Sequence, residues 1–588
     1  MKKRFILLLA LFIISTSYLS AMTNGQKIHP IDSSIYSSME KLYLLENHSL
    51  PSSSKPWSEA EILDMLDGVN PTSKTSKMLY DNIYNQVGAK SEISLSDDDV
   101  RMNFDITTAF EVYAHQNEVF KDEEYWVHGF NYREKFLDVE WDLFSSDNIY
   151  VYFDAVILMN SLGNHHNDEN GNYLYQNKFV TNSPLLPPAD FGADGDFTFP
   201  YRSFGSFGSD HWNLSIGRDR FSWGPGESGN LVLGDHFIQH DFIKFTTFHN
   251  SYKYTLFSSF YPPDSTMGVD QNWEPTGFKM FLGHRIEFSF LEDKLGLALS
   301  ESVIYKTDYN TLNLAAINPF GFFHNEYIRG MANSLISAEI DYNPFGYLDI
   351  YGQFAIDEIS LGEKSQPEAG SYPNAFGYMI GAKAAIPISE KYVAKTSLEA
   401  VFTDPFLYLR GLDNIENDDT DLNGYSHGYG FDAIVKNFNS PGDYKRMYLG
   451  YEYGGDAIVI NYTSSIENIG LWSAYFDAMY MLHGNKRLDS GWSSYGKNGL
   501  DELVTILSGD VIERTLILSL GGRLDIPQVS GMYVKTNVDY INIENMVDDE
   551  PTSSGITSDY GDTYDDYLNI EGNNESDIQM SFALGYTF

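Results

Sequence analysis

Residues 578–588, at the carboxy-terminal end of the chain, carry an apolar side chain at every second position and end on an aromatic residue. Because successive side chains of a β-strand point to opposite faces of the sheet, this segment has one apolar and one polar face. The final strand of a bacterial outer-membrane barrel has this pattern, and Tyr586 and Phe588 would then lie in the aromatic girdle at the membrane boundary. A half-buried strand of a soluble domain would alternate in the same way, so the rest of the chain has to distinguish the two.

The amino-terminal end has the features of a secretory signal. Basic residues at positions 2–4 precede an apolar run over residues 5–14, and small or polar residues lead to Ala21. We therefore predict a signal peptide over residues 1–21 and export from the cytoplasm. Cysteine is absent, which excludes a lipid-modified amino-terminal cysteine and a disulfide framework. After Ala21 no stretch approaches the roughly 18 apolar residues of a spanning helix, so a membrane-embedded form would have to be a barrel.

The composition fits a barrel whose lipid-facing and interior residues alternate. The chain has 42 Tyr, 39 Phe and 8 Trp, yet its mean hydropathy of -0.30 is that of a water-soluble protein. The formal net charge of -44 repels phosphate backbones, so we expect no nucleic-acid partner. Neutral or cationic partners, or partners bridged by metal ions, are compatible with this charge. A secreted acidic binding protein would share it, so charge alone does not place the chain in a membrane.

Residues 22–97 differ from the rest because their periodicity is helical. Asp32 is positioned to cap a first helix, Ser58 and Glu61 form a capping box for a second, and Pro71 marks the start of a third. We interpret this segment as a small bundle on the periplasmic side of the barrel. The alternative is a partly ordered spacer.

Residues 98–588 are predicted to form the transmembrane outer-membrane β-barrel, an all-β fold of about 18 antiparallel strands. No repeat of 20 to 50 residues is visible, which disfavours a propeller or solenoid. The strand patterns cover residues 104–113, 136–144, 149–159, 212–218, 242–248, 254–260, 278–290, 295–305, 335–342, 348–356, 378–386, 393–402, 447–453, 457–462, 471–481, 515–524, 532–541 and the terminal strand.

Turn lengths test this strand count, because outer-membrane barrels alternate short periplasmic turns with long outer loops. Short turns are predicted at 145–148, 250–251, 292–293, 343–346, 389–390, 454–455 and 528–530. The alternation fails between residues 218 and 242 and between 481 and 515. Extra strands at 231–233 and 503–507 would give twenty strands, and merging elements would give sixteen. Long loops near 160–210, 306–331, 403–445, 483–512 and 542–575 are expected, some folded into the lumen.

The densest motif spans residues 216–231, where four glycines and a proline lie beside Arg218, Arg220 and Trp223. In an acidic chain, two arginines next to an indole stand out. Trp223 could stack on a sugar ring while the guanidinium groups bind hydroxyls or carboxylates. The alternative is an ion-pair network in the lumen that fixes an inward-folded loop.

A set of segments spread over most of the chain covers residues 44–46, 56–58, 217–226, 284–285, 318–323, 354–358 and 450–456. In this order they resemble the Wzi-type outer-membrane proteins of capsule assembly. The resemblance implies an eighteen-stranded barrel with a periplasmic helical bundle, plugged by loops, that acts as a lectin holding capsular polysaccharide at the cell surface. Two of the segments add Asp357 and Asp456 to the ligand-binding candidates. This chain is longer in its acidic loops than typical members, so the identity of the glycan is left open.

A calcium loop is suggested by Asp419, Asp421 and Asn423, which place oxygen ligands at alternate positions ahead of a glycine. The glutamate expected at the twelfth position is replaced by Gly430. A calcium ion is the one cofactor that this pattern supports, and a solvated acidic loop is the alternative.

Enzyme signatures are weak, and we expect no enzymatic activity. No Gly-x-Ser-x-Gly elbow, zinc-protease helix or phosphate-binding loop occurs. A phospholipase would need Ser300 or Ser302 aligned with His284 on the outer wall of the barrel.

Two functions therefore remain: a glycan-binding anchor for surface polysaccharide, and a porin-like channel for small solutes. Outer-membrane lipid and the barrel-assembly machinery are the other expected partners. The predicted location is the outer membrane.

Overall fold

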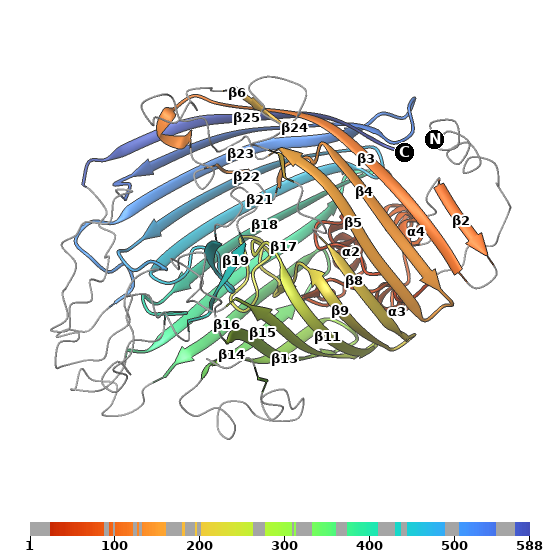
Figure 1. The fold of residues 1–588 in the computed structure, drawn as a ribbon, viewed down its shortest axis with the longest axis horizontal. Coiled ribbons are helices and arrows are strands. Elements are labelled where there is room, and N and C mark those ends of the chain that lie inside the picture. Colours follow the sequence, from red (N-terminus) through yellow and green to blue (C-terminus); the bar gives the residue numbers. More distant parts are fainter. Residues whose placement is uncertain are drawn as a thin grey trace.

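The computed structural model describes residues 24–87, 93–97, 100–121, 126–128, 132–159, 179–182, 195–196, 202–262, 277–307, 311–312, 332–359, 373–409, 430–436, 444–488, 505–547 and 571–588. These residues form a closed antiparallel barrel of 18 strands (Figure 1). The strands of its wall are β3 (Val100–His115), β4 (Leu137–Ser145), β5 (Ile149–Met159), β8 (Ser203–Ser209), β9 (Trp212–Asp219), β11 (His240–His249), β12 (Tyr252–Tyr261), β13 (Phe278–Phe290), β14 (Leu295–Thr307), β15 (Ala332–Tyr342), β16 (Leu348–Glu358), β17 (Ala375–Pro387), β18 (Tyr392–Thr403), β21 (Ala457–Asn468), β22 (Trp472–His483), β23 (Glu513–Asp525), β24 (Met532–Glu544) and β25 (Asn574–Thr587).

The barrel closes where the last strand meets the first. β25 pairs with β3 over a register that runs from Gln579 opposite His115 to Thr587 opposite Thr107. Closure leaves no open edge, so the wall strands satisfy one another's backbone hydrogen bonds, as a lipid environment requires. The predicted fold class is thereby confirmed.

The terminal strand shows which way the side chains of the wall point. Met580 and Phe582 are 41% and 49% exposed on the outer face, whereas Gln579 is fully buried on the inner face. The same alternation on the other wall strands gives an apolar outer belt that includes Ile216, Leu299 and Ile380. The inner face carries most of the polar and charged side chains.

A charge at the end of the terminal strand tests its outward face. Phe588 lies on the outer side, 46% exposed, and its N–H donates to the Ile106 carbonyl at 2.9 Å. We expect Phe588→Asp to block insertion and leave the protein in the periplasm, because it places a charge in the aromatic girdle. Thr587→Asp is the matched control, since the Thr587 hydroxyl lies 3.0 Å from that of Thr107 on the inner face. Equal amounts of heat-modifiable protein from both variants would contradict the assignment.

All but one of the predicted strands belong to the wall. The exception is 447–453: its first residues lie in β20 (Tyr444–Tyr448), which pairs with β19 (Asp432–Lys436) in a separate sheet. The missing wall strand is β8, in a region predicted to be a loop. The sequence of β8 is Ser-Phe-Gly-Ser-Phe-Gly-Ser. Because it has no β-branched residue, it does not show the usual pattern of a strand. The extra strand proposed at 231–233 is a single bridge from Leu233 to Trp223.

With β8 in place, short turns and long connections alternate without a break. The short turns at 210–211 and 469–471 were not predicted, and the predicted turn at 454–455 does not join two wall strands. It lies instead in a segment that precedes β21. All the hairpin turns of the wall therefore meet at one end of the barrel, here called the short-turn end.

The part of the chain that the structure describes contains three α-helices, α2 (Ser34–Leu45), α3 (Glu59–Asp67) and α4 (Lys74–Val87). The capping box of Ser58 and Glu61 is present before α3. The cap of α2 is Ser33 rather than Asp32, and α4 begins at Lys74, a few residues after the predicted start. β2 (Ile93–Asp97) follows the helices and pairs with β3. The predicted signal peptide lies outside the described residues.

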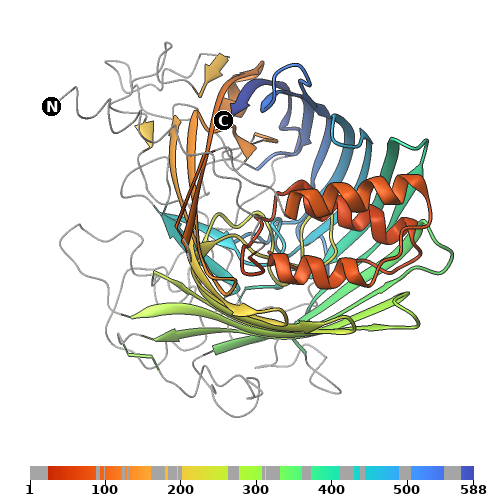
Figure 2. The ribbon, with the colours of Figure 1, turned by 90° about the vertical axis from the view of Figure 1, so that its right-hand side faces the viewer.

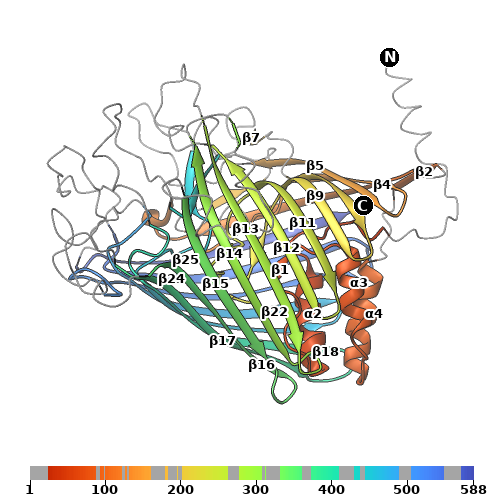
Figure 3. The same cartoon turned by 90° about the horizontal axis from the view of Figure 1, so that it is seen from below.

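The helices lie in the mouth of the barrel at the short-turn end (Figures 2 and 3). Their apolar faces share a core that also includes Ala385 and Val393 from the inner wall. Thr75 of α4 donates to the carbonyl of Ser389 in the turn between β17 and β18. The periplasmic location of this helical segment stays a prediction.

Candidate functional site

The lumen of the barrel is occupied by a core of inward-folded segments. Three stretches between wall strands contribute to it: residues 220–239, residues 404–409, and residues 430–436 with 444–456. We call them together the plug. Phe221, Leu231 and Tyr451 of the plug share one buried apolar cluster with Phe257 and Phe281 of the inner wall. The small sheet of β19 and β20 lies inside the barrel outline (Figure 1).

Trp223 joins the plug to the amino-terminal segment and to the wall. β10 (Ser222–Trp223) pairs with β1 (Ser54–Lys55), and the backbone N–H of Trp223 donates to the Leu233 carbonyl at 3.0 Å. The indole lies 6.0 Å from the ring of Phe257 and is 1% exposed. A Cβ on the facing residue Gly283 would lie 2.9 Å from this indole, so the wall is shaped to receive it. Trp223 therefore has no free face on which a sugar could stack.

The glycines that follow Trp223 allow a path that other residues could not take. Gly224 has a φ of 137°, and a Cβ there would lie 2.1 Å from the side-chain oxygen of Asn230. A Cβ on Gly226 would lie 1.9 Å from the Gly229 carbonyl. The tight path brings Glu227 to the inner wall.

Glu227 takes part in a buried charge cluster that links three parts of the molecule. Its carboxylate lies 2.7 Å from Lys383 on β17 and 2.8 Å from Lys395 on β18. Glu40 of α2 lies 2.5 Å from Lys395 in the same cluster. Burial opposes ionisation of Glu227, but the two lysines outweigh it and lower its pKa to about 2. The plug, the helices and the wall are thus joined by charge as well as by packing.

Arg218 lies on the other side of the wall. On β9 it shares the outer face with Leu214 and Ile216, and its guanidinium forms a two-pronged ion pair with Asp241 of β11 at 2.7 and 3.1 Å. The structure therefore does not bring Arg218 and Trp223 into one pocket. One side chain lies on the outer surface and the other in the plug.

Arg220 is placed differently, at the end of the plug opposite the helices. It follows the end of β9 away from the hairpin turn, and it donates to the Asp235 carbonyl at 2.5 Å. Its Nε has no hydrogen-bond partner among the described residues. Tyr132, 53% exposed, lies in the lumen, where its ring is 5.6 Å from that of His128, and His128 pairs with Asp539 of the inner wall. The hydroxyl of Tyr132 is within electrostatic range of Glu452, Asp235 and Arg220. We call Tyr132, Arg220, Asp235 and Glu452 the outward cluster.

Asp357 and Asp456 are occupied by hydrogen bonds within the protein. Asp357 accepts from the Asn333 amide at 2.7 Å and from the backbone N–H of Tyr408 in the plug at 2.8 Å. Asp456 is fully buried and accepts from the backbone N–H groups of Lys486 and Ser508 at 3.0 and 2.8 Å. Both carboxylates hold inward-folded segments in place.

The predicted calcium residues Asp419, Asp421 and Asn423 lie outside the described residues. Within the described ranges no group of three or more acidic or histidine side chains is arranged to hold a metal ion. None of the helices in those ranges has the length and apolar character needed to span a bilayer.

The serine and histidine considered for a phospholipase lie on opposite faces of the wall. Ser300 faces the lumen, where its hydroxyl accepts from Arg285 at 3.3 Å. His284 is on the outer face and pairs with Glu301 at 2.9 Å. Because Ser302 shares the inner face with Ser300, neither serine can use His284 as a base.

A closed, outwardly apolar barrel with long strands and short turns at one end defines the class of outer-membrane β-barrels. No protein-family model matches this chain, and no curated protein matches its sequence. Among solved structures the chain is similar to Wzi of Escherichia coli, an outer-membrane protein involved in group 1 capsule assembly and a carbohydrate-binding β-barrel. The similarity covers 95% of this chain and 99% of Wzi, with 15% identity and a TM-score of 0.54. At this identity it shows the fold.

Two further similarities are weaker. OmpT, an outer membrane protein of Vibrio cholerae, is 8% identical over 84% of this chain and 99% of its own, with a TM-score of 0.33. OccK2 of Pseudomonas aeruginosa is 9% identical over 83% and 97%, with a TM-score of 0.37. Neither carries an argument about function.

Proposed function

We propose that this protein binds surface polysaccharide at the outward cluster and holds it at the cell surface, with the barrel closed by its plug. The observation that carries the proposal is the filled lumen: a core that includes Trp223, Phe257 and Tyr451 is buried inside the wall. A barrel filled in this way is suited to present a fixed surface to the exterior. The overall likeness to Wzi agrees with the proposal.

The outward cluster has the chemistry that a sugar chain requires. Tyr132 offers an aromatic face on which a sugar ring can stack. The exposed carboxylates of Asp235 and Glu452 can accept hydrogen bonds from sugar hydroxyls, and Arg220 can donate them. Arg220 thus keeps the role first assigned to it, while Tyr132 replaces Trp223 as the stacking residue. The calcium loop at Asp419, Asp421 and Asn423 stays a prediction.

A porin-like channel is the second candidate function. It is favoured by the partly exposed inner face of β21 and β22. The inner residues Ser465, Ser473 and Tyr475 on β21 and β22 are only half-buried near the short-turn end. Toward the opposite end the same wall is covered, since Met479 and Met481 are 8% and 6% exposed. Solvent therefore enters this side of the lumen at the short-turn end, and the described residues close it further on. This arrangement favours the anchor over the channel.

The anchor function is tested by removing the stacking face. Tyr132→Ala is expected to weaken binding of the cell's own extracted surface polysaccharide about tenfold, the effect of losing roughly 1.4 kcal/mol. Tyr540→Ala is the matched control, because Tyr540 lies on the outer wall, 37% exposed, away from the cluster. Binding to purified protein in detergent is the measurement. Wild-type affinity in Tyr132→Ala would reject the outward cluster as the site.

A further inference from the structure

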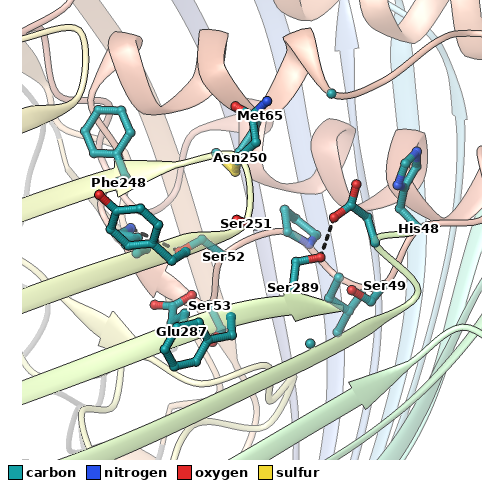
Figure 4. A pocket seen from close by; sticks show the side chains of 18 of the residues that line it. His48, Ser49, Ser52, Ser53, Met65, Phe248, Asn250, Ser251, Glu287 and Ser289 are labelled. Atoms are coloured by element: carbon teal, nitrogen blue, oxygen red, sulfur yellow. Dashed lines mark hydrogen bonds between the residues drawn. The ribbon is translucent and has the colours of Figure 1, made fainter. Parts of the chain in front are cut away.

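A pocket with a volume of about 170 Å³ lies at the short-turn end of the barrel (Figure 4). One wall is the linker between α2 and α3, around His48 and Ser52, and the other is the inner face of β12 to β15. The exposed turn residues Asn250 and Ser251 form part of its rim. A small molecule could therefore enter it from the short-turn end.

The lining combines hydroxyl groups, carboxylates and aromatic rings. Ser49, Ser52 and Ser289 surround the space together with Tyr43 and Phe248. Serine hydroxyls donate and accept hydrogen bonds, and an aromatic ring offers a flat apolar face. This mixture suits a ligand that carries hydroxyl groups on a ring and has no extended apolar part.

The charge balance of the pocket decides which such ligand it can hold. Glu287 and Glu339 share one cation, Arg285, at 3.0 and 2.5 Å, so one of their two negative charges is left over. Lys253 in the lining is paired with Glu61 at 3.0 Å. Asp293 also lines the pocket, and no cation lies within ion-pair distance of it among the described residues. The pocket is therefore negative, and it would repel a sugar acid or a phosphate.

His48 adds a neutral group with two hydrogen-bonding nitrogens. Burial lowers the pKa of its imidazole below the usual value, although Asp293 and Glu46 act in the opposite direction. Near pH 7 the ring is thus neutral, with one nitrogen as donor and the other as acceptor. A neutral imidazole matches a hydroxyl partner better than it would an anion.

We propose that this pocket binds a single neutral or amine-bearing sugar unit that lacks an acidic group. The inference is independent of the function proposed for the outward cluster, because the two sites share no residue. A sugar unit bound here would contact both the helices and the wall. It would stabilise their association by RT ln(1 + L/Kd), where L is the free sugar concentration.

The test is calorimetric titration of the detergent-purified full chain with glucosamine, glucose and glucuronate in the millimolar range. Glucosamine and glucose are expected to bind and glucuronate is not. Ala298→Leu should weaken binding at least about tenfold, because the larger side chain fills part of the pocket. Residue 298 lines the pocket between its register partners Glu287 on β13 and Glu339 on β15. Ala338→Leu is the matched control, since Ala338 is exposed on the outer face of the adjacent strand.

A second pocket variant keeps the proposal testable if Ala298→Leu does not fold. Asn250→Trp enlarges an exposed residue at the rim, where the core is not disturbed, and should also weaken binding. Absence of heat with both glucosamine and glucose, equal binding of glucuronate, or unchanged binding in both pocket variants would overturn the proposal.

Discussion

Trp223→Ala is expected to lower the free energy of unfolding by about 3–5 kcal/mol, the usual cost of removing a fully buried large aromatic side chain. The indole packs against Phe257 and Phe281 and adjoins Gly283, so its loss leaves a cavity between plug and wall. The neighbouring backbone is fixed by pairing with β1, which limits collapse of that cavity. Denaturant unfolding of the refolded protein, followed by intrinsic fluorescence and heat modifiability, is the measurement.

Trp141→Ala serves as the control for this substitution. Trp141 lies on β4 with its ring against Phe104 and Phe153, and Phe153 is exposed on the outer face. Lipid or detergent can fill the space left on the outer wall, so we expect a smaller loss of stability. Equal losses in the two variants would show that Trp223 does not hold the plug.

Glu227→Gln is the second large effect that we expect. Removing this carboxylate leaves Lys383 and Lys395 with only the buried Glu40 as a common partner. Breaking a buried ion pair from one side costs about 3–5 kcal/mol, because the remaining charge stays buried. The exposed pair of Lys74 and Glu390 gives the matched control, and Glu390→Gln should cost less than about 1 kcal/mol. Indistinguishable unfolding midpoints would contradict the structural role of the cluster.

The same carboxylate predicts how stability depends on pH. The pKa of Glu227 is lowered to about 2 in the folded protein, against about 4.3 for an unperturbed glutamate. A lowered folded-state pKa means that the stabilisation is complete above pH 4.3 and is lost as the pH falls toward 2. Wild-type protein should therefore lose stability over this interval. Glu227→Gln should show a smaller loss there, because glutamine does not titrate.

Local patterns were sufficient for most of the wall. Alternation predicted the terminal strand, and the capping box of Ser58 and Glu61 located the start of α3, because both signals act over a few neighbouring residues. The strand count agrees only because two differences cancel. β8 has no β-branched residue and does not show a strand pattern, whereas 447–453 alternates like a wall strand although its strand is buried in the plug. Alternation identifies a strand without showing which sheet it joins.

The site was harder to predict, for a different reason in each residue. Arg218 is two residues from Ile216 and four from Leu214, so all three side chains point to the same face of β9. Once β9 is recognised as a strand, the sequence shows that Arg218 points outward. Trp223 lies beyond the end of β9, in the separate strand β10, so the alternation along β9 does not predict which way its side chain points. Tyr132 stands in no motif, and its proximity to Arg220 and Glu452 depends on segments that are far apart in the chain. Only the closed barrel brings these residues together.

The most direct test of the closed lumen is the conductance of the purified wild-type protein in a planar lipid bilayer. The plug shares one apolar core with the wall and is joined to it through the pairs that Glu227 forms with Lys383 and Lys395. A lumen closed by the plug predicts that the protein inserts without stable steps of current under moderate voltage. Reproducible single-channel steps from the wild-type protein would contradict it and would support the porin-like channel instead.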